Sequence, residues 1–117
     1  MPTDNIIAIK SKAFALRIIR LNKYLIHTHR EFVLSKQIMR SGTSIGANVK
    51  EAIRAESKPD FYHKMNIALK EASETEYWLE LLHESDYLHD KHFQGIYGEC
   101  QELIRILIAI TKTRDET

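Results

Sequence analysis

The sequence has few of the residues that interrupt helices or staple small folds. Its 117 residues include four glycines, two prolines and one cysteine. Cys100 has no partner for a disulfide within the chain, and a lone cysteine is more often a small buried apolar residue than a reactive thiol. So few turn-forming residues leave little room for long irregular loops. We therefore expect regular secondary structure around one hydrophobic core, in a single domain spanning residues 1–117.

Long hydrophobic runs are also absent. The longest wholly apolar run is Ile106–Ile110, far short of the roughly 20 residues that cross a bilayer. The first residues have neither the apolar segment nor the small-residue cleavage site of a secretory signal. We expect a cytoplasmic protein without a membrane partner.

Charge is balanced in total but uneven along the chain. Residues 1–64 hold twelve Lys/Arg and five Asp/Glu, a formal charge of +7, whereas residues 65–117 hold five and eleven, a charge of −6. This asymmetry predicts one basic and one acidic surface. Such surfaces suit an anionic partner, and they equally suit pairing between copies of the chain.

Apolar residues recur at helical spacing in four segments. In the second segment, for example, Leu34, Ile38, Ile45 and Ala52 fall on one buried stripe. No segment alternates with the period of a strand, and no Asn-Gly or Asp-Gly hairpin signal occurs. The sequence predicts an all-α, antiparallel up-down-up-down four-helix bundle. The predicted helices cover about 4–27, 30–57, 57–85 and 90–112.

The run from Arg40 to Ala52, RSGTSIGANVKEA, contains two glycines four residues apart. A phosphate-binding loop of the Walker type needs Gly-x-x-x-x-Gly-Lys-Ser/Thr after a strand, and neither the spacing nor the strand is present. In a helix, Gly42 and Gly46 share one face and allow another backbone to approach closely. We therefore predict close helix packing at these glycines, and the slim residues around them also favour contacts between subunits.

Two stretches of the sequence carry a family resemblance. The run SKQIMRSGTSIGANVKEA, followed about twenty residues later by IALKEASETEYWLELL, resembles the 23S rRNA-intervening sequence proteins, a family of small four-helix bundles. That family has Arg, then Ser-Ile-x-x-Asn-Ile/Val-x-Glu on one helix, and a Glu followed by an apolar WLE-L segment on the next. Ala52 stands where the family commonly has Gly, which favours continued helix. The matching residues are Arg40, Ser44, Ile45, Asn48, Val49 and Glu51, then Glu74, Trp78, Leu79, Glu80 and Leu82.

The resemblance implies a ring-like homo-oligomer, typically a pentamer, with no established catalytic activity. Some members of the family are encoded inside insertions in bacterial large-subunit ribosomal RNA genes. Relatives accompany the reverse transcriptases of diversity-generating retroelements and bind both the transcriptase and nucleic acid. The partners implied are therefore other copies of the chain, RNA or DNA, and a reverse transcriptase.

Basic residues follow one face of the second predicted helix. Small residues separate them, no acidic residue interrupts them, and the first helix adds further cations. In a ring this basic face would be repeated on every copy, so that phosphate contacts accumulate. The competing interpretations are a solvated face, or pairing with the acidic third helix of a neighbouring copy. The candidate nucleic-acid-binding residues are Arg17, Arg20, Lys36, Arg40, Lys50 and Arg54.

Polar residues beside the apolar stripes predict structural rather than catalytic roles. Because a buried polar group needs a partner, we expect Ser44, Asn48, Glu51 and Glu74 to form a network that fixes the register of two helices, with Arg40 or Ser44 as donors. A di-iron bundle needs Glu-x-x-His on two helices, and the motif occurs once, at Glu80–His83. No nucleophile with a neighbouring base is evident either. We therefore expect no catalytic residue, metal or cofactor.

These patterns lead to one functional prediction and one alternative. The prediction is a non-enzymatic, homo-oligomeric helical bundle that acts as a nucleic-acid-binding accessory factor, associated with ribosomal RNA or with a reverse transcriptase. The alternative is a purely structural protein–protein interaction module without a nucleic-acid role.

Overall fold

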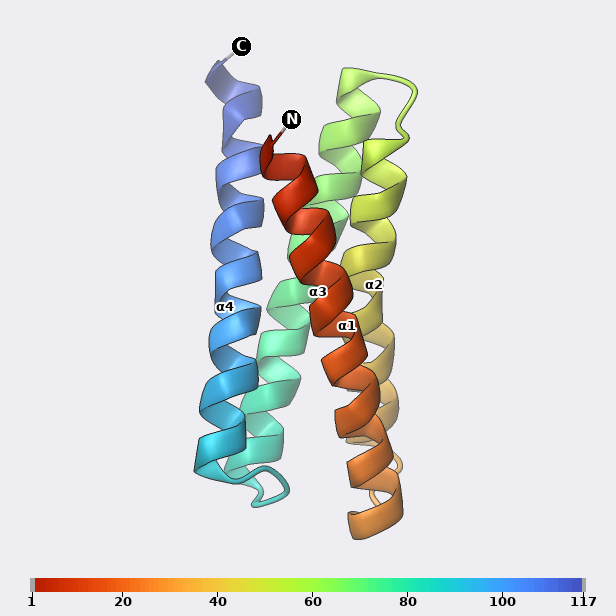
Figure 1. Cartoon of the computed structure of the whole chain (residues 1–117), viewed down its shortest axis with the longest axis vertical. Coiled ribbons are helices and arrows are strands. Elements are labelled where there is room, and N and C mark those ends of the chain that lie inside the picture. Colours follow the sequence, from red (N-terminus) through yellow and green to blue (C-terminus); the bar gives the residue numbers. More distant parts are fainter. Residues whose placement is uncertain (1, 117) are drawn as a thin grey trace.

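Four long helices make up almost the whole chain (Figure 1). The computed structural model describes the backbone of residues 2–116 and the side chains of residues 6–114. The elements are α1 (Pro2–His29), α2 (Leu34–Ile53), α3 (Lys58–Glu84), α4 (Asp90–Lys112) and a 3-10 helix, η1 (Thr113–Glu116). No strand occurs in residues 2–116. The prediction of an all-α four-helix bundle is confirmed.

The helices pack in a closed order around one core. Each helix contacts the next, and α4 contacts α1, so that α1 lies diagonally across from α3 (Figure 1). The face formed by α1 and α2 is therefore opposite the face formed by α3 and α4. The bundle is elongated, with extents of 47, 21 and 19 Å.

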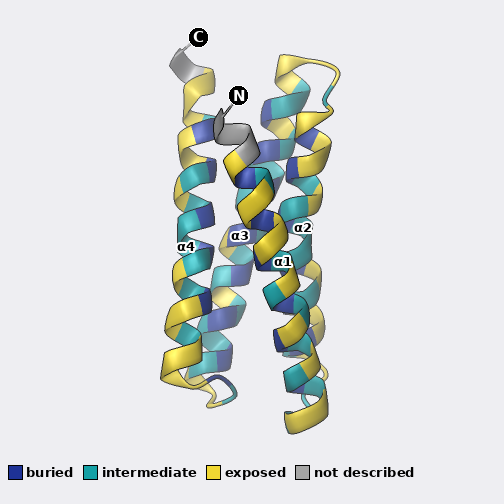
Figure 2. Cartoon of the chain, viewed as in Figure 1, coloured by how far each residue is buried: buried dark blue, intermediate teal, exposed yellow. Residues whose placement is uncertain are grey.

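The core consists of the apolar stripes that the sequence pattern indicates. Buried positions line the inner sides of all four helices (Figure 2). Each helix contributes residues at i, i+3 and i+4 spacing, which brings them to the same side. The largest wholly buried apolar side chains are Phe14, Ile7, Ile18, Leu25, Ile38, Ile45, Met65, Leu79, Leu82, Leu103, Leu107 and Val49.

The second helix is shorter than its sequence pattern predicts. We expected residues 30–57, whereas α2 covers Leu34–Ile53. At its start, Arg30 has a φ of 54°, a left-handed conformation that ends α1 and turns the chain. Two residues before Pro59, Ser57 is extended and caps α3, since its Oγ accepts a hydrogen bond from the Asp60 amide at 3.2 Å. The prediction was wrong at both ends because apolar periodicity does not reveal the reversal at Arg30 or the loop before Ser57.

A glutamate rather than a small polar residue caps the start of α2. The Glu31 carboxylate accepts hydrogen bonds from the amides of Val33, Leu34 and Ser35 at 3.2, 3.1 and 2.7 Å. The Ser35 hydroxyl in turn donates to the Glu31 carbonyl oxygen at 2.7 Å. Burial alone would raise the pKa of Glu31, but these bonds to its charged form outweigh burial and lower the pKa. The ionised carboxylate thus holds the chain reversal between α1 and α2.

Candidate assembly and nucleic-acid interface

The glycine-rich run lies within continuous helix and packs against α1. A Cβ atom added at Gly42 would lie 2.7 Å from Cγ1 of Ile18, inside contact distance. At Gly46 it would lie 3.4 Å from the carbonyl oxygen of Ser11. The slim flank of α2 is thus covered by a helix of the same chain. The close packing predicted at these glycines is therefore a contact between α1 and α2 of one chain.

A shallow groove opens on the outer surface between α1 and α2. Its volume is about 500 Å³, and small side chains and methyl groups form most of its lining. Three cations, Lys12, Lys50 and Arg54, belong to the lining, which contains no acidic residue. The complete lining is Ala8, Ser11, Lys12, Ala15, Thr43, Gly46, Ala47, Val49, Lys50, Ile53 and Arg54. We refer to this feature as the α1–α2 groove.

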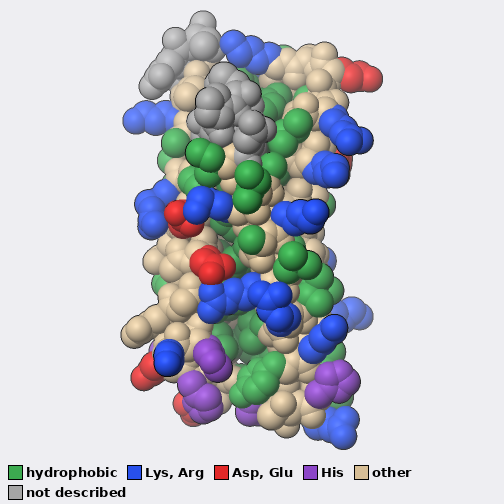
Figure 3. Space-filling view, viewed as in Figure 1, with side chains coloured by type: hydrophobic (Ala, Val, Ile, Leu, Met, Phe, Trp, Pro, Cys, Tyr) green, Lys and Arg blue, Asp and Glu red, His purple; other side chains and the backbone are tan. Residues whose placement is uncertain are grey.

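Large apolar side chains are exposed next to this groove. Ile9 is 70% exposed and Leu16 is 50% exposed, and each directly follows a groove residue of α1 in the sequence. Ile53, in the groove itself, is 48% exposed. Figure 3 shows hydrophobic and basic side chains together on the face of the molecule that carries α1. Single exposed apolar residues are ordinary, but a group beside a groove is typical of an interaction surface.

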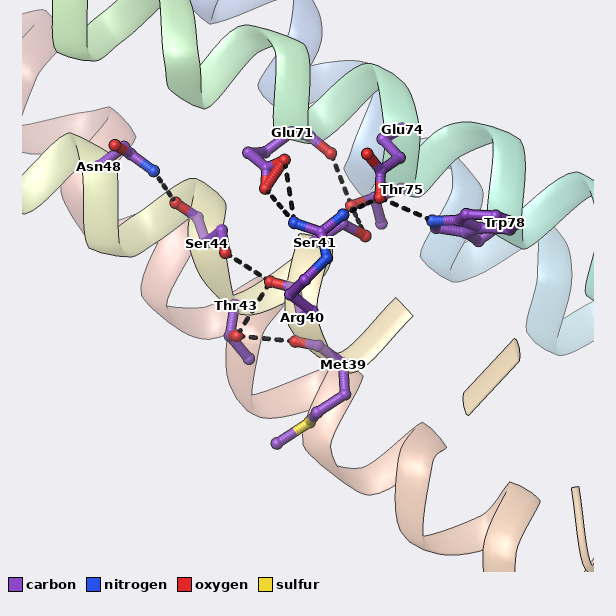
Figure 4. Close-up of polar contacts among 10 residues, drawn as sticks. All are labelled: Met39, Arg40, Ser41, Thr43, Ser44, Asn48, Glu71, Glu74, Thr75 and Trp78. Carbon is purple, nitrogen blue, oxygen red and sulfur yellow. Dashed lines mark hydrogen bonds and ion pairs between the residues drawn. The ribbon is translucent and has the colours of Figure 1, made fainter. Parts of the chain in front are cut away.

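The opposite side of α2 makes charged contacts with α3. The Arg40 guanidinium donates to Glu71 at 2.9 Å and also to Glu74 (Figure 4). Trp78 completes the group, because its Nε1 donates to the same Glu74 carboxylate at 3.0 Å. Burial alone would lower the pKa of Arg40, but the bonds and charges of the two glutamates outweigh it and raise the pKa.

A buried hydroxyl pair lies directly beneath the arginine. Thr75 Oγ1 is 2.8 Å from Ser41 Oγ and 2.8 Å from the Glu71 carbonyl oxygen (Figure 4). Both side chains are fully buried. The pair is a polar contact of α2 with α3 inside the core, and it fixes the register of these two helices. From the sequence we expected that role for the network around Asn48 and Glu74.

Of the four residues predicted to form one polar network, only Ser44 and Asn48 contact each other. Asn48 Nδ2 donates to the Ser44 carbonyl oxygen at 2.8 Å, and the Ser44 hydroxyl donates to the Arg40 carbonyl oxygen at 2.5 Å, all within α2. Glu51 lies 3.1 Å from the Lys64 ammonium group. Only Glu74 joins a contact of the expected kind, with Arg40 as donor. Glu71, Thr75 and Trp78, which are spaced along the same helix as Glu74, supply the partners that the sequence analysis missed.

The structure divides the six candidate nucleic-acid-binding residues into three groups. Arg40 is paired as described, and Arg17 forms an ion pair with Glu99 of α4. Lys50 and Arg54 line the α1–α2 groove. Arg20 and Lys36 are exposed elsewhere on α1 and α2, and neither has an ion pair among the described side chains.

Arg17 and Arg20 lie together in a second cleft, between α1 and α4. This cleft has a volume of about 360 Å³ and also contains Tyr24 and His92. Its floor is apolar, formed by Leu21, Leu88 and Ile96. Close by, Asn22 Nδ2 donates to the Ser35 carbonyl oxygen at 2.9 Å, which brings the adjacent Lys23 and Lys36 to the same end of the molecule.

The side chains that the sequence singles out as possible metal ligands form separate pairs. No group of three or more His, Cys, Asp or Glu side chains in the described part of the chain is arranged to hold a metal ion. Glu80 accepts a hydrogen bond from the Tyr97 hydroxyl at 2.6 Å, and His83 lies 2.6 Å from Asp90. The two side chains of the di-iron motif, Glu80 and His83, therefore interact with different partners. Among the described residues, no helix is long and apolar enough to cross a membrane.

The fold and its surface first define a class of protein: a small all-α bundle with a groove and exposed apolar side chains on its α1–α2 face. Comparison with known proteins then gives the family. The family model of the 23S rRNA-intervening sequence protein matches residues 3–109. The chain belongs to this family.

A solved structure agrees with this assignment. It is the crystal structure of a protein with unknown function from the S23 ribosomal protein family of Bacteroides thetaiotaomicron. The two chains are 52% identical, with a TM-score of 0.92, and the match covers 94% of this chain and 98% of the other. No curated protein matches the chain.

Proposed function

We propose that the protein is a non-enzymatic assembly module that forms a homo-oligomer, of the ring-like pentameric type that the family resemblance implies. The observation that carries this proposal is the group of exposed apolar side chains, Ile9, Leu16 and Ile53, beside the α1–α2 groove. Covering apolar surface with a second chain contributes about 25 cal/mol per Å² removed from water. In a closed oligomer, every copy gains this contribution.

Polar substitution on the exposed face tests the assembly. Ile9→Glu with Leu16→Glu places two charges where a partner chain would have to exclude water. We expect the variant to sediment as a monomer with unchanged helical circular dichroism, since both side chains are exposed in the monomer. Ile108→Glu is the control, because Ile108 is similarly exposed, at 48%, but lies on α4. Equal assembly of the double variant and the wild type would contradict the proposal.

A second function, nucleic-acid binding by this assembly, is favoured by exposed cations that form no ion pair among the described side chains. Arg20 lines the α1–α4 cleft, Lys23 and Lys36 are exposed on α1 and α2 at the same end of the molecule, and none of the three lines the α1–α2 groove. Repetition of these cations around an oligomer would add phosphate contacts on every copy. An accessory role toward ribosomal RNA or a reverse transcriptase, implied by the family resemblance, belongs to this second proposal. The alternative is an assembly that binds only protein.

Salt-dependent retention of labelled single-stranded RNA and DNA separates these possibilities. We expect retention at low salt, a loss of affinity as salt rises, and weaker binding by Arg20→Glu with Lys36→Glu. Each phosphate contact removed should reduce the slope of log K against log salt by about 1. Lys70→Glu with Lys91→Glu carries the same charge change on α3 and α4 and should bind normally. Absence of retention at low salt would leave the protein-only alternative.

A further inference from the structure

The cations of the α1–α2 groove are not paired with any carboxylate of the described side chains. Lys50 and Arg54 on α2 and Lys12 on α1 contribute to its lining. None of them has an ion pair among the described side chains, although other cations of the same helices, such as Lys10 with Glu102 at 3.3 Å, do. The groove thus combines an apolar floor with three uncompensated positive charges. An occupant that fits it is apolar at its centre and acidic at its margin.

The outer surface of α3 has the opposite character. Glu76, Glu80 and Glu84 follow one another at four-residue spacing, which places them along one side of the helix. Next to Glu76, Tyr77 is 53% exposed and presents a large aromatic ring to solvent. We call these four residues the acidic edge. None of its three carboxylates forms an ion pair among the described residues.

The negative potential of the acidic edge affects neighbouring groups on α4. Burial raises the pKa of the Cys100 thiol to about 12, and the charges of Glu76 and Glu80 add to the effect. The hydrogen bond to Glu80, followed by burial and the same two charges, raises the pKa of Tyr97. Burial, the hydrogen bond and the carboxylate charges all act in the same direction on these two groups.

The groove and the acidic edge cannot neutralise each other within one molecule. The groove lies between α1 and α2, whereas Glu76 and Glu80 lie toward α4 on α3, on the opposite face of the bundle (Figure 1). Two complementary surfaces on opposite faces favour head-to-tail association, which closes into a ring or continues as a filament. Exposed aromatic residues are common anchors at such interfaces, and a lining of alanine and glycine leaves room for a ring.

We propose that the α1–α2 groove of one copy binds the acidic edge of a second copy of this chain. In this contact Tyr77 lies over the apolar floor of the groove, and the three carboxylates of the acidic edge face the three cations of the groove. This inference rests on the proposed homo-oligomer and names its contact. It also assigns Lys50 and Arg54 to assembly and leaves Arg20 and Lys36 for nucleic acid.

Charge reversal tests this pairing in the full-length chain. The groove variant is Lys50→Glu with Arg54→Glu, and the edge variant is Glu76→Lys with Glu84→Lys. None of these four side chains makes a hydrogen bond or ion pair among the described residues, so each variant should retain the helical fold, which circular dichroism checks. A third variant combines all four changes. The control, Arg20→Glu with Lys36→Glu, has the same charge change as the groove variant.

Molar mass from light scattering gives the result. The groove and edge variants should each fall to the 13.7 kDa monomer, the combined variant should recover the wild-type mass, and the control should keep it. An oligomeric wild type whose mass neither reversal changes would overturn the pairing but leave the proposed assembly standing. Failure of the combined variant to reassemble would also overturn the pairing. A monomeric wild type would overturn both proposals.

Discussion

The two sides of α2 hold their neighbours by different means. Toward α1 the contact is steric: Gly42 and Gly46 bring the backbone of α2 against Ile18 and Ser11. Toward α3 it is polar, with a buried Ser41–Thr75 pair and the Arg40 ion pairs above it. A steric contact tolerates no added volume, whereas a polar contact tolerates volume but requires its partners. The third side of α2 faces outward. Its cations Lys50 and Arg54 line the groove and have no ion-pair partner among the described side chains.

The largest expected effect is on the steric side. Gly42→Val adds a branched side chain where a single Cβ atom would already lie 2.7 Å from Ile18. We expect the free energy of unfolding to fall by about 3 kcal/mol, because overpacking a core displaces its neighbours. Urea denaturation followed by circular dichroism measures this change.

Gly98 provides the matched control for that substitution. Apart from its chain neighbours and the backbone of its own helical turn, no atom of the described residues lies within 4 Å of a Cβ placed at Gly98, although Gly98 too lies inside a helix. Gly98→Ala should therefore raise the free energy of unfolding by up to about 1 kcal/mol. A stabilising effect of Gly42→Val, or a loss at Gly98→Ala in the monomer, would contradict the description of the steric side.

The buried hydroxyl pair should give the next largest effect. Thr75→Val keeps the shape of the side chain but leaves the Ser41 hydroxyl without its hydrogen-bond partner in the core. We expect a loss of about 2 kcal/mol, the usual cost of an unsatisfied buried polar group. The double variant Ser41→Ala with Thr75→Val should lose less than the sum of the two single variants. Strict additivity in this cycle would mean that the pair does not couple α2 to α3.

Glu31 caps the start of α2, the helix whose two sides make these different contacts. Because its folded pKa is lowered, its contribution to stability is fully present above the unfolded pKa, about 4.3 for Glu. It is lost as the pH falls through the lower folded pKa. Glu31→Gln should cost about 1 kcal/mol at neutral pH, and the difference from wild type should shrink on acidification. A difference that stays constant down to pH 2 would argue against the charged cap.

Arg40 should give the smallest effect, although it makes the most visible contacts. Its side chain is 50% exposed, and exposed ion pairs contribute roughly 0.5 kcal/mol. Arg40→Gln should cost about that much at low salt and almost nothing at 1 M salt. The Gly42→Val effect should not depend on salt in this way. A similar salt dependence for both variants would mean that the α1 side and the α3 side of α2 do not differ in the kind of contact that they make.

Much of the fold could be predicted from the sequence because apolar periodicity reports directly on the buried side of a helix. Phe14, Ile18, Leu79 and Leu107 are buried as their spacing indicates. The end of α1 and the start of α2 could not be predicted in this way, since Arg30 and the Glu31 carboxylate act through backbone conformation and capping, to which periodicity is insensitive.

The candidate site was harder to predict because charge along a helix does not reveal what faces it. Arg17 and Arg40 belong to basic patterns in the sequence, yet Glu99 and Glu71 approach them from other helices. Lys12 was not among the candidates, although it lines the groove with Lys50 and Arg54. Glu71 and Trp78 share a helical side with Glu74, and their spacing was the signal that could have identified them as further members of the expected Arg40–Glu74 contact.

The central claim is that the outward face of α1 and α2 is completed by another copy of the chain. Light scattering of the wild-type protein over a range of micromolar concentrations tests it most directly. We predict a molar mass of at least two times 13.7 kDa, and a whole multiple of it. A mass of 13.7 kDa throughout that range would contradict it.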